Sequence, residues 1–133
     1  MPPERFPPDD PREWLNRARG NLVRAKATLP GAYLEDLCFD AQQAAEKALK
    51  AVLLKQQGSF PYTHDLADLV TLLKESDEEI PDAVKQAGRL TRFAVVTRYP
   101  GVIEPVTEEE HLEAVATAEV VVQWVEKQLG EQA

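Results

Sequence analysis

Helix start and stop signals divide this chain into five amphipathic segments, and this pattern constrains the fold more than any other feature. The sequence contains no period-2 alternation, no Asn-Gly or Asp-Gly hairpin turn and no internal repeat. Because the connections between the segments are short, consecutive helices are expected to pack as antiparallel neighbours. The sequence therefore predicts an all-α fold, an up-and-down bundle of four to five helices.

Capping residues mark where the helices begin. Asp10 is an N-cap candidate with Pro11 at the first helical position, and Thr107 with Glu110 has the spacing of a capping box. Thr63 is the expected cap of a short third helix. The predicted helices cover residues 11–29, 32–57, 64–75, 82–98 and 108–130.

Composition bounds the class of protein. The 133 residues suffice for one domain, so we expect a loose, Pro-rich N-terminal arm over residues 1–9 and a single helical domain over residues 10–130. The lone Cys38 excludes an intrachain disulfide and a Cys-based zinc site. The chain has no apolar run of about 18 residues and no signal-peptide pattern, so we expect no membrane span and a cytoplasmic location.

The net charge of −8 is unevenly distributed along the chain. Residues 99–133 hold one Lys or Arg against eight Asp or Glu, whereas residues 1–98 are almost neutral. Binding to nucleic acid in bulk comes from neutralising phosphates, so it is not expected here. The charge distribution does not exclude a local basic face formed by residues 1–98.

The segment CFDAQQAAEKALKAVLLKQ, residues 38–56, carries a polar line inside an apolar helix. That line is Gln43, Glu46 and Lys50. In one interpretation Glu46 and Lys50 form an i,i+4 pair on a solvated face, worth about 0.2–0.5 kcal/mol. In the other, the line lies at a groove or subunit seam and meets a ligand or partner. At about 100° per residue the predicted core face holds Cys38, Ala41, Ala45, Leu49 and Val52.

The segment RFAVVTRYPG, residues 92–101, ends the fourth predicted helix. With α-helical periodicity, Arg98 falls on the inward side of that helix near its end. A guanidinium there can satisfy terminal carbonyl groups, or it can bind phosphate oxygens bidentately. Both interpretations stay open.

Three segments together resemble the HEPN family of small helical-bundle domains. They are FDAQQAAEKALKAVLLKQQG (39–58), THDLADLV (63–70) and RYPG (98–101), in this order along the chain. The resemblance implies a bundle of four or five helices that dimerises. It also implies a minimal nucleotidyltransferase as partner, in a two-component or toxin–antitoxin pair.

The sequence departs from the family's ribonuclease motif. Many HEPN domains cleave RNA without metal, using an arginine followed after four to six residues by a histidine. Here twelve residues separate Arg98 from His111, and no arginine precedes His64 at the required spacing. Arg98 and Tyr99 match the arginine region, but the histidine that would act as acid or base is missing. We therefore expect no catalytic residue.

Other chemistry has weaker support in the sequence. There is no metal-binding spacing of His and carboxylate residues and no Gly-rich phosphate loop, so we expect no metal site and no cofactor. His64 is interpreted as packing near the start of its helix. Cys38 is interpreted as a small core residue rather than a nucleophile.

The main hypothesis is a homodimer that binds a nucleotide or another phosphate-bearing ligand and works with a minimal nucleotidyltransferase. One alternative is a diverged ribonuclease toxin of a toxin–antitoxin pair, and another is a purely structural dimer. The expected ligand-binding residues are Gln43, Glu46, Lys50, His64, Arg98 and Tyr99.

Overall fold

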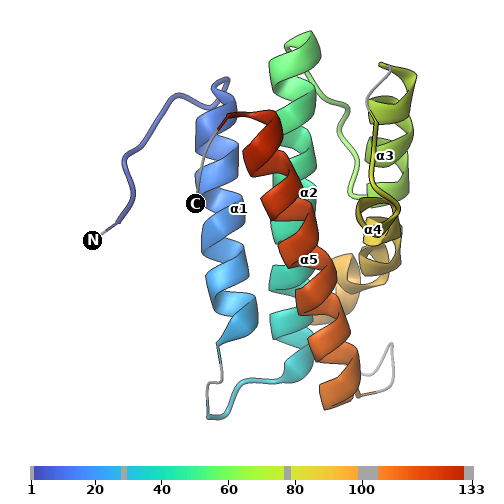
Figure 1. Ribbon diagram of the computed structural model, residues 1–133. Coiled ribbons are helices and arrows are strands. Elements are labelled where there is room, and N and C mark those ends of the chain that lie inside the picture. Colours follow the sequence, from blue (N-terminus) through green and yellow to red (C-terminus); the bar gives the residue numbers. More distant parts are fainter. Residues whose placement is uncertain (1, 28–29, 77–78, 99–104, 131–133) are drawn as a thin grey trace.

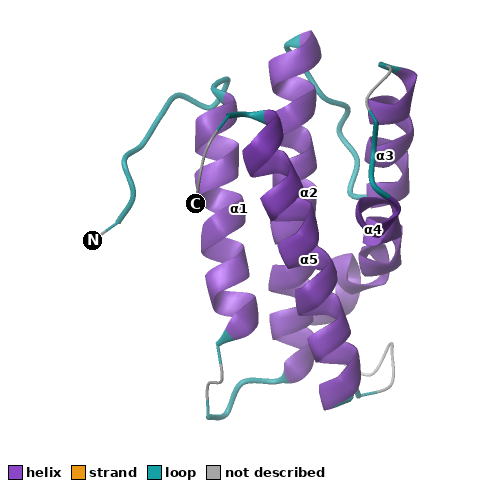
Figure 2. Ribbon diagram, viewed as in Figure 1, coloured by secondary structure: helices purple, strands orange, loops and turns teal. Residues whose placement is uncertain are grey.

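A computed structural model shows helices packed into a bundle (Figures 1 and 2). It describes residues 2–27, 30–76, 79–98 and 105–130, with the backbone alone at 95–98, and this part of the chain contains no strand. The predicted all-α helical bundle is confirmed. Each described helix is too short or too polar to cross a membrane.

The central helix of the bundle is α2 (Leu34–Gln57), and α1 (Pro11–Lys26) lies beside it. The Asp10 side chain caps α1 by accepting the N–H of Arg12, as predicted. Gly58 ends α2 with φ 76°, a left-handed conformation that glycine adopts without steric cost. Both helices are slightly shorter than the predicted 11–29 and 32–57.

α3 (Leu66–Glu75) begins two residues beyond its predicted start. The side chain of Asp65 accepts the N–H of Ala67, and the hydroxyl of Thr63 accepts the N–H of Asp65. The predicted Thr63 cap is therefore wrong, because Asp65 occupies the N-cap and Thr63 orders the residues before it. The connection 58–65 doubles back along α2, so α3 runs in the same direction as α2 (Figure 1).

The fourth predicted helix is α4 (Asp82–Lys85) continued by the 3₁₀-helix η1 (Gln86–Arg98). Its buried side chains, Ala87, Leu90 and Phe93, follow one another at intervals of three, the period of a 3₁₀-helix. The inward placement of Arg98 assumed 3.6 residues per turn, so it no longer follows. The side chain of Arg98 and all of Tyr99 lie outside the described residues.

α5 (Glu108–Gln128) packs against α1 and α2 and closes the core. The predicted capping box is confirmed, since the Thr107 hydroxyl accepts the N–H of Glu110 and the Glu110 carboxylate accepts that of Thr107. Helical spacing in the sequence predicts a buried stripe of Leu112, Val115, Ala118, Val122, Val125 and Leu129 on this helix. This prediction is wrong for Leu112, which is 66% exposed. The α5 side chains that face the core are Ala114, Ala118, Val121, Val122, Trp124 and Val125.

The N-terminal arm is held against α1. The backbone N–H of Phe6 donates to Glu13 Oε1 at 2.9 Å, and Trp14 Nε1 donates to the carbonyl of Pro8 at 2.8 Å. The hydrogen bond from Phe6 and the ion pair with Arg17 lower the pKa of Glu13. The described part of the arm is therefore ordered by α1 rather than loose.

Candidate functional site

A buried carboxylate lies at the centre of the polar line on α2. Glu46 accepts hydrogen bonds from Gln42 Nε2 at 2.8 Å and from Lys50 Nζ at 3.0 Å. The side chains of Glu46 and Lys50 are only 4% and 6% exposed. Gln42, Glu46 and Lys50 follow at intervals of four, so helical geometry alone brings their side chains together.

A fourth polar side chain extends this network. Gln43 Nε2 donates to Gln42 Oε1 at 2.7 Å, which satisfies the amide oxygen of a fully buried residue. No buried polar side-chain atom in the described part of the chain lacks a hydrogen-bond partner. The network is thus complete, as buried polar groups must be if they are not to destabilise the fold.

The connection 58–65 covers the network. The ammonium of Lys50 lies 5.1 Å from the ring centroid of Phe60, within the range of a cation–π contact. Phe60 in turn packs edge-to-face against Trp14 of α1, with 4.9 Å between ring centroids. Phe60 therefore links the connection that covers the network to α1.

His64 brings the network to the surface. Its Nδ1 lies 3.0 and 3.1 Å from the two carboxylate oxygens of Glu46, and its side chain is 48% exposed. A carboxylate that already accepts from Lys50 and Gln42 is an acceptor only, so Nδ1 must carry the hydrogen. The neutral imidazole then has its lone pair on Nε2.

An aromatic neighbour completes the exposed part of the site. Tyr62 is 95% exposed and packs edge-to-face against His64, with 5.7 Å between ring centroids. Four of the six predicted ligand-binding residues, Gln43, Glu46, Lys50 and His64, belong to one hydrogen-bond network, in which Lys50 and His64 contact Glu46 directly and Gln42 links Gln43 to Glu46.

Two sequence-based interpretations need correction. The pair of Glu46 and Lys50 forms as predicted, but it is buried, so the solvated face is wrong. The apolar surroundings of α2 and the connection 58–65 exclude water from it. His64 does not pack at the start of its helix. It lies before the N-cap of α3 and contacts α2 instead.

Three residues of the site were not predicted from the sequence. Gln42 precedes Glu46 by four positions, and this spacing could have identified it. Phe60 and Tyr62 lie in a connection without periodicity, so no sequence pattern places them beside α2.

The second histidine has a structural role. His111 Nε2 lies 2.7 Å from the carbonyl oxygen of Ala25, which can only accept, so Nε2 carries the hydrogen. This bond satisfies one of the terminal carbonyl groups of α1. His111 and His64 are therefore expected in opposite tautomers.

Nucleophilic and metal chemistry find little support. The buried position of Cys38 raises its thiol pKa to about 11, which leaves it protonated at neutral pH. The described residues contain no group of three His, Cys, Asp or Glu side chains placed to hold a metal ion.

The comparisons with known proteins decide the family. The HEPN domain family matches residues 11–128, nearly the whole chain. The chain belongs to the HEPN family. The predicted resemblance is confirmed.

Two solved structures resemble this HEPN protein closely. TT1696 from Thermus thermophilus is 33% identical over 89% of this chain and 97% of its own, with a TM-score of 0.72. ST0689, an archaeal HEPN homologue, is 29% identical over 90% of this chain and 98% of its own, with a TM-score of 0.71. No curated protein matches the chain significantly.

Proposed function

We propose that this HEPN protein is a homodimer that binds a nucleotide or a related phosphate-bearing ligand and acts with a minimal nucleotidyltransferase. The observation that carries the proposal is the contact between the buried carboxylate of Glu46 and the half-exposed imidazole of His64. When the imidazole takes up a second proton, Nε2 as well as Nδ1 carries a hydrogen, and Nε2 can then donate a hydrogen bond to a phosphate oxygen. Tyr62 offers a ring on which a base can stack.

The burial of Glu46 supports a functional rather than a purely structural network. Replacing a buried ion pair by apolar residues is often neutral or stabilising, so such a pair is weak evidence for a role in stability. Holding one histidine nitrogen fixes the orientation of the ring and directs the other nitrogen outward. A ligand site needs this orientation, whereas a helix bundle does not.

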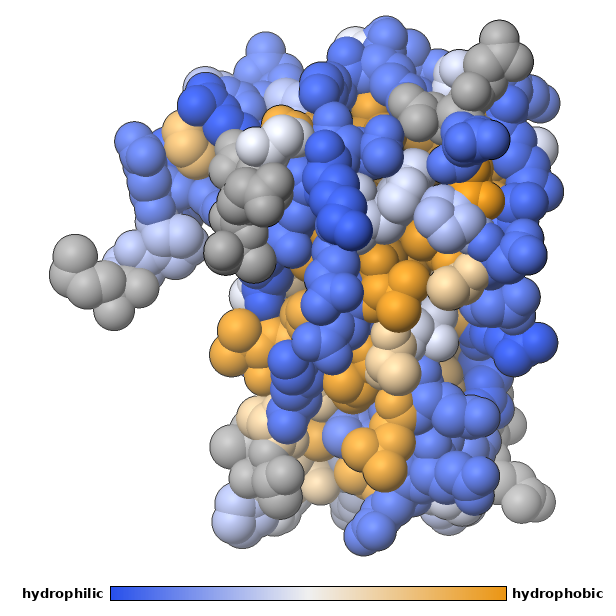
Figure 3. Space-filling model, viewed as in Figure 1, coloured by the Kyte–Doolittle hydropathy of each residue, from blue (hydrophilic) through white to orange (hydrophobic). Residues whose placement is uncertain are grey.

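The surface of α5 supports the homodimer. Leu112, Ala116 and Val120 are exposed at intervals of four and form an apolar stripe, and Val23 of α1 is also exposed. Figure 3 shows hydrophobic surface on the face where α5 lies. A stripe of this kind is typical of a helix that packs against a second copy.

Two measurements test the assembly. Sedimentation equilibrium at micromolar concentration should give about twice the monomer mass of 14.9 kDa. Val120→Glu should shift this mass toward the monomer, and Lys127→Glu on the same helix is the control. For the partner, co-purification with a nucleotidyltransferase encoded beside this protein is the expected result, and separate elution contradicts the pairing.

Ligand binding is tested by calorimetric titration with nucleoside mono-, di- and triphosphates. His64→Ala and Tyr62→Ala should each weaken binding about tenfold, as expected for the loss of a charged hydrogen bond or a stacked base. Tyr33→Ala is the matched control, because Tyr33 is also an exposed tyrosine. Equal affinities in His64→Ala and the parent contradict the proposed site.

A second function has one specific observation in its favour. Nε2 of His64, supported by the Glu46 carboxylate, has the arrangement of a general base. Against it stands the missing family motif, so we expect little or no cleavage of total RNA by the purified protein. Degradation that disappears in both His64→Ala and Arg98→Ala would instead establish a diverged ribonuclease.

A further inference from the structure

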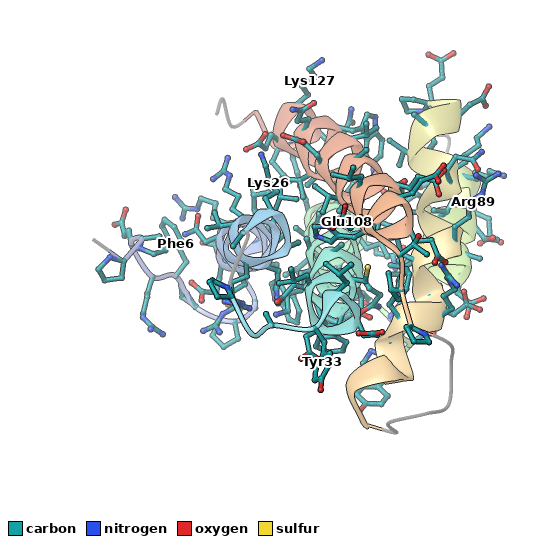
Figure 4. The ribbon with its side chains drawn as sticks, turned by 90° about the horizontal axis from the view of Figure 1, so that it is seen from below. Phe6, Lys26, Tyr33, Arg89, Glu108 and Lys127 are labelled. Carbon is teal, nitrogen blue, oxygen red and sulfur yellow. The ribbon has the colours of Figure 1, made fainter. Side chains whose placement is uncertain are left out.

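We propose that the groove between α1 and α2, on the side away from α5, binds a small phosphate-bearing anion at a site separate from His64. Figure 4 shows α5 above the α1–α2 pair, while α3, α4 and η1 lie on the other side of α2 from α1. A cavity of about 300 Å³ lies between the arm and the two helices. This volume is at the lower end of the range for small-molecule sites.

The charge of the groove contrasts with that of the chain. Four cationic side chains line the cavity, against two carboxylates, although the whole chain carries −8. The cations are Arg5, Arg17, Arg24 and Lys47. A positive hollow on an acidic protein raises the local concentration of small anions.

The two α1 arginines that line the cavity, Arg17 and Arg24, can donate further hydrogen bonds. Arg17 contacts Glu13 at 2.7 Å and Arg24 contacts Asp40 at 3.2 Å, in both cases through Nε. By contrast, Arg19 holds Glu126 with two nitrogens. Both groove guanidiniums are more than half exposed, so their terminal nitrogens can reach a phosphate, which suits their planar fork.

Lys47 of α2 completes the positive wall. Its Nζ donates to Asn21 Oδ1 at 2.8 Å, so the ammonium is positioned on the α1 side of α2. Burial lowers the pKa of Lys47, and the nearby charges of Arg24 and Arg17 lower it further, against the smaller opposite effect of Glu46 and Asp40. Cations held this close repel each other, and a bound anion relieves that repulsion.

Gly20 leaves room for the ligand. Arg17, Gly20 and Arg24 follow at intervals of three and four, so they share one face of α1. A Cβ at Gly20 meets no atom within 4 Å, so the glycine is not needed for packing. In the middle of a helix this residue is unfavourable, and here it opens the cavity wall between the two arginines.

Inorganic pyrophosphate is the probe for this site. Calorimetric titration of the full chain should show binding that weakens as the salt concentration rises. Arg24→Gln and Lys47→Gln should each weaken binding about tenfold, the loss of one charge-assisted hydrogen bond. Gly20→Leu keeps every charge but fills the cavity, and it should abolish binding. Arg89→Gln is the control, since Arg89 lies on the opposite side of the molecule from Phe6 of the arm (Figure 4).

The outcomes separate this site from the one at His64. Pyrophosphate binding that is unchanged in His64→Ala and weakened about tenfold in Arg24→Gln supports the groove. Binding lost in His64→Ala but unchanged in Arg24→Gln overturns the groove and leaves the proposed function intact. Absence of pyrophosphate binding at low ionic strength also overturns the groove.

Discussion

Lys47 and Lys50 lie three residues apart on α2, yet their surroundings differ completely. Lys50 has a carboxylate one turn before it, and it is buried against Glu46 and Phe60. Lys47 bonds to Asn21 of α1, and the charges that act on it include those of Arg17 and Arg24. The comparison teaches that a lysine's role on a helix depends on its i−4 residue and on the helix it faces.

The largest loss of stability is expected when Lys50 loses its buried partner Glu46. Glu46→Ala leaves Lys50 buried without its counter-charge, which should destabilise the protein by about 3–5 kcal/mol in denaturant unfolding. The control is Glu119→Ala, because Glu119 and Lys26 form a pair at the same 3.0 Å but on the surface. That control should lose less than about 1 kcal/mol, and equal losses would contradict the burial of Glu46.

Leu49, on the apolar face of α2, allows the loss of stability in Glu46→Ala to be compared with that of an ordinary core substitution. Leu49 is fully buried, so Leu49→Ala should destabilise by about 2–5 kcal/mol through loss of contacts and a residual cavity. Leu112→Ala is the control on the exposed stripe and should change stability by less than about 0.5 kcal/mol. A larger loss of stability in Leu112→Ala than in Leu49→Ala, measured by thermal or denaturant melts, would show that the core face assigned to α2 is wrong.

Removing both charges sharpens the comparison. Glu46→Leu combined with Lys50→Met leaves no buried charge, so most of the stability lost in Glu46→Ala should return. We expect a remaining loss of about 1–3 kcal/mol, because the buried amide of Gln42 then lacks its acceptor. A double variant less stable than Glu46→Ala would show that the pair is stabilising in itself.

The smallest effect is expected from a change at Lys47. Lys47→Gln removes one of several clustered cations, and the relief of repulsion offsets the weakened bond to Asn21. The free energy of unfolding should therefore change by less than about 1 kcal/mol. A loss as large as that of Glu46→Ala would make Lys47 a structural residue and weaken the case for the groove.

The fold could be predicted from the sequence because its signals are local. Asp10, Gly58 and Thr107 end or begin helices by hydrogen bonds and conformations within a few residues. One failure lies where packing overrides local preference, and the other lies in a choice between two local caps. η1 adopts a tighter period than its sequence predicts, and Asp65 displaces Thr63 as a cap because Thr63 bonds to Asp65 instead.

The site was predictable only in part, for a related reason. Spacing brought Glu46 and Lys50 together, since one helix determines their separation. Whether water reaches them depends on the connection 58–65, which has no periodicity and folds back over α2. The groove was harder still to predict from the sequence, because Arg24 and Lys47 belong to two different helices. No local sequence signal indicates how these two helices are rotated relative to each other.

The central claim is that Glu46 fixes His64 with its Nε2 lone pair directed outward, and nitrogen NMR tests it most directly. Spectra of the imidazole nitrogens are recorded at a pH above about 8, where an ordinary histidine is neutral. We predict that His64 carries its hydrogen on Nδ1, while His111, bonded to the carbonyl of Ala25, carries it on Nε2. In Glu46→Gln the preference at His64 should weaken, and His111 should not change. A His64 with its hydrogen on Nε2 and a bare Nδ1 could not donate to Glu46, and this result would contradict the account.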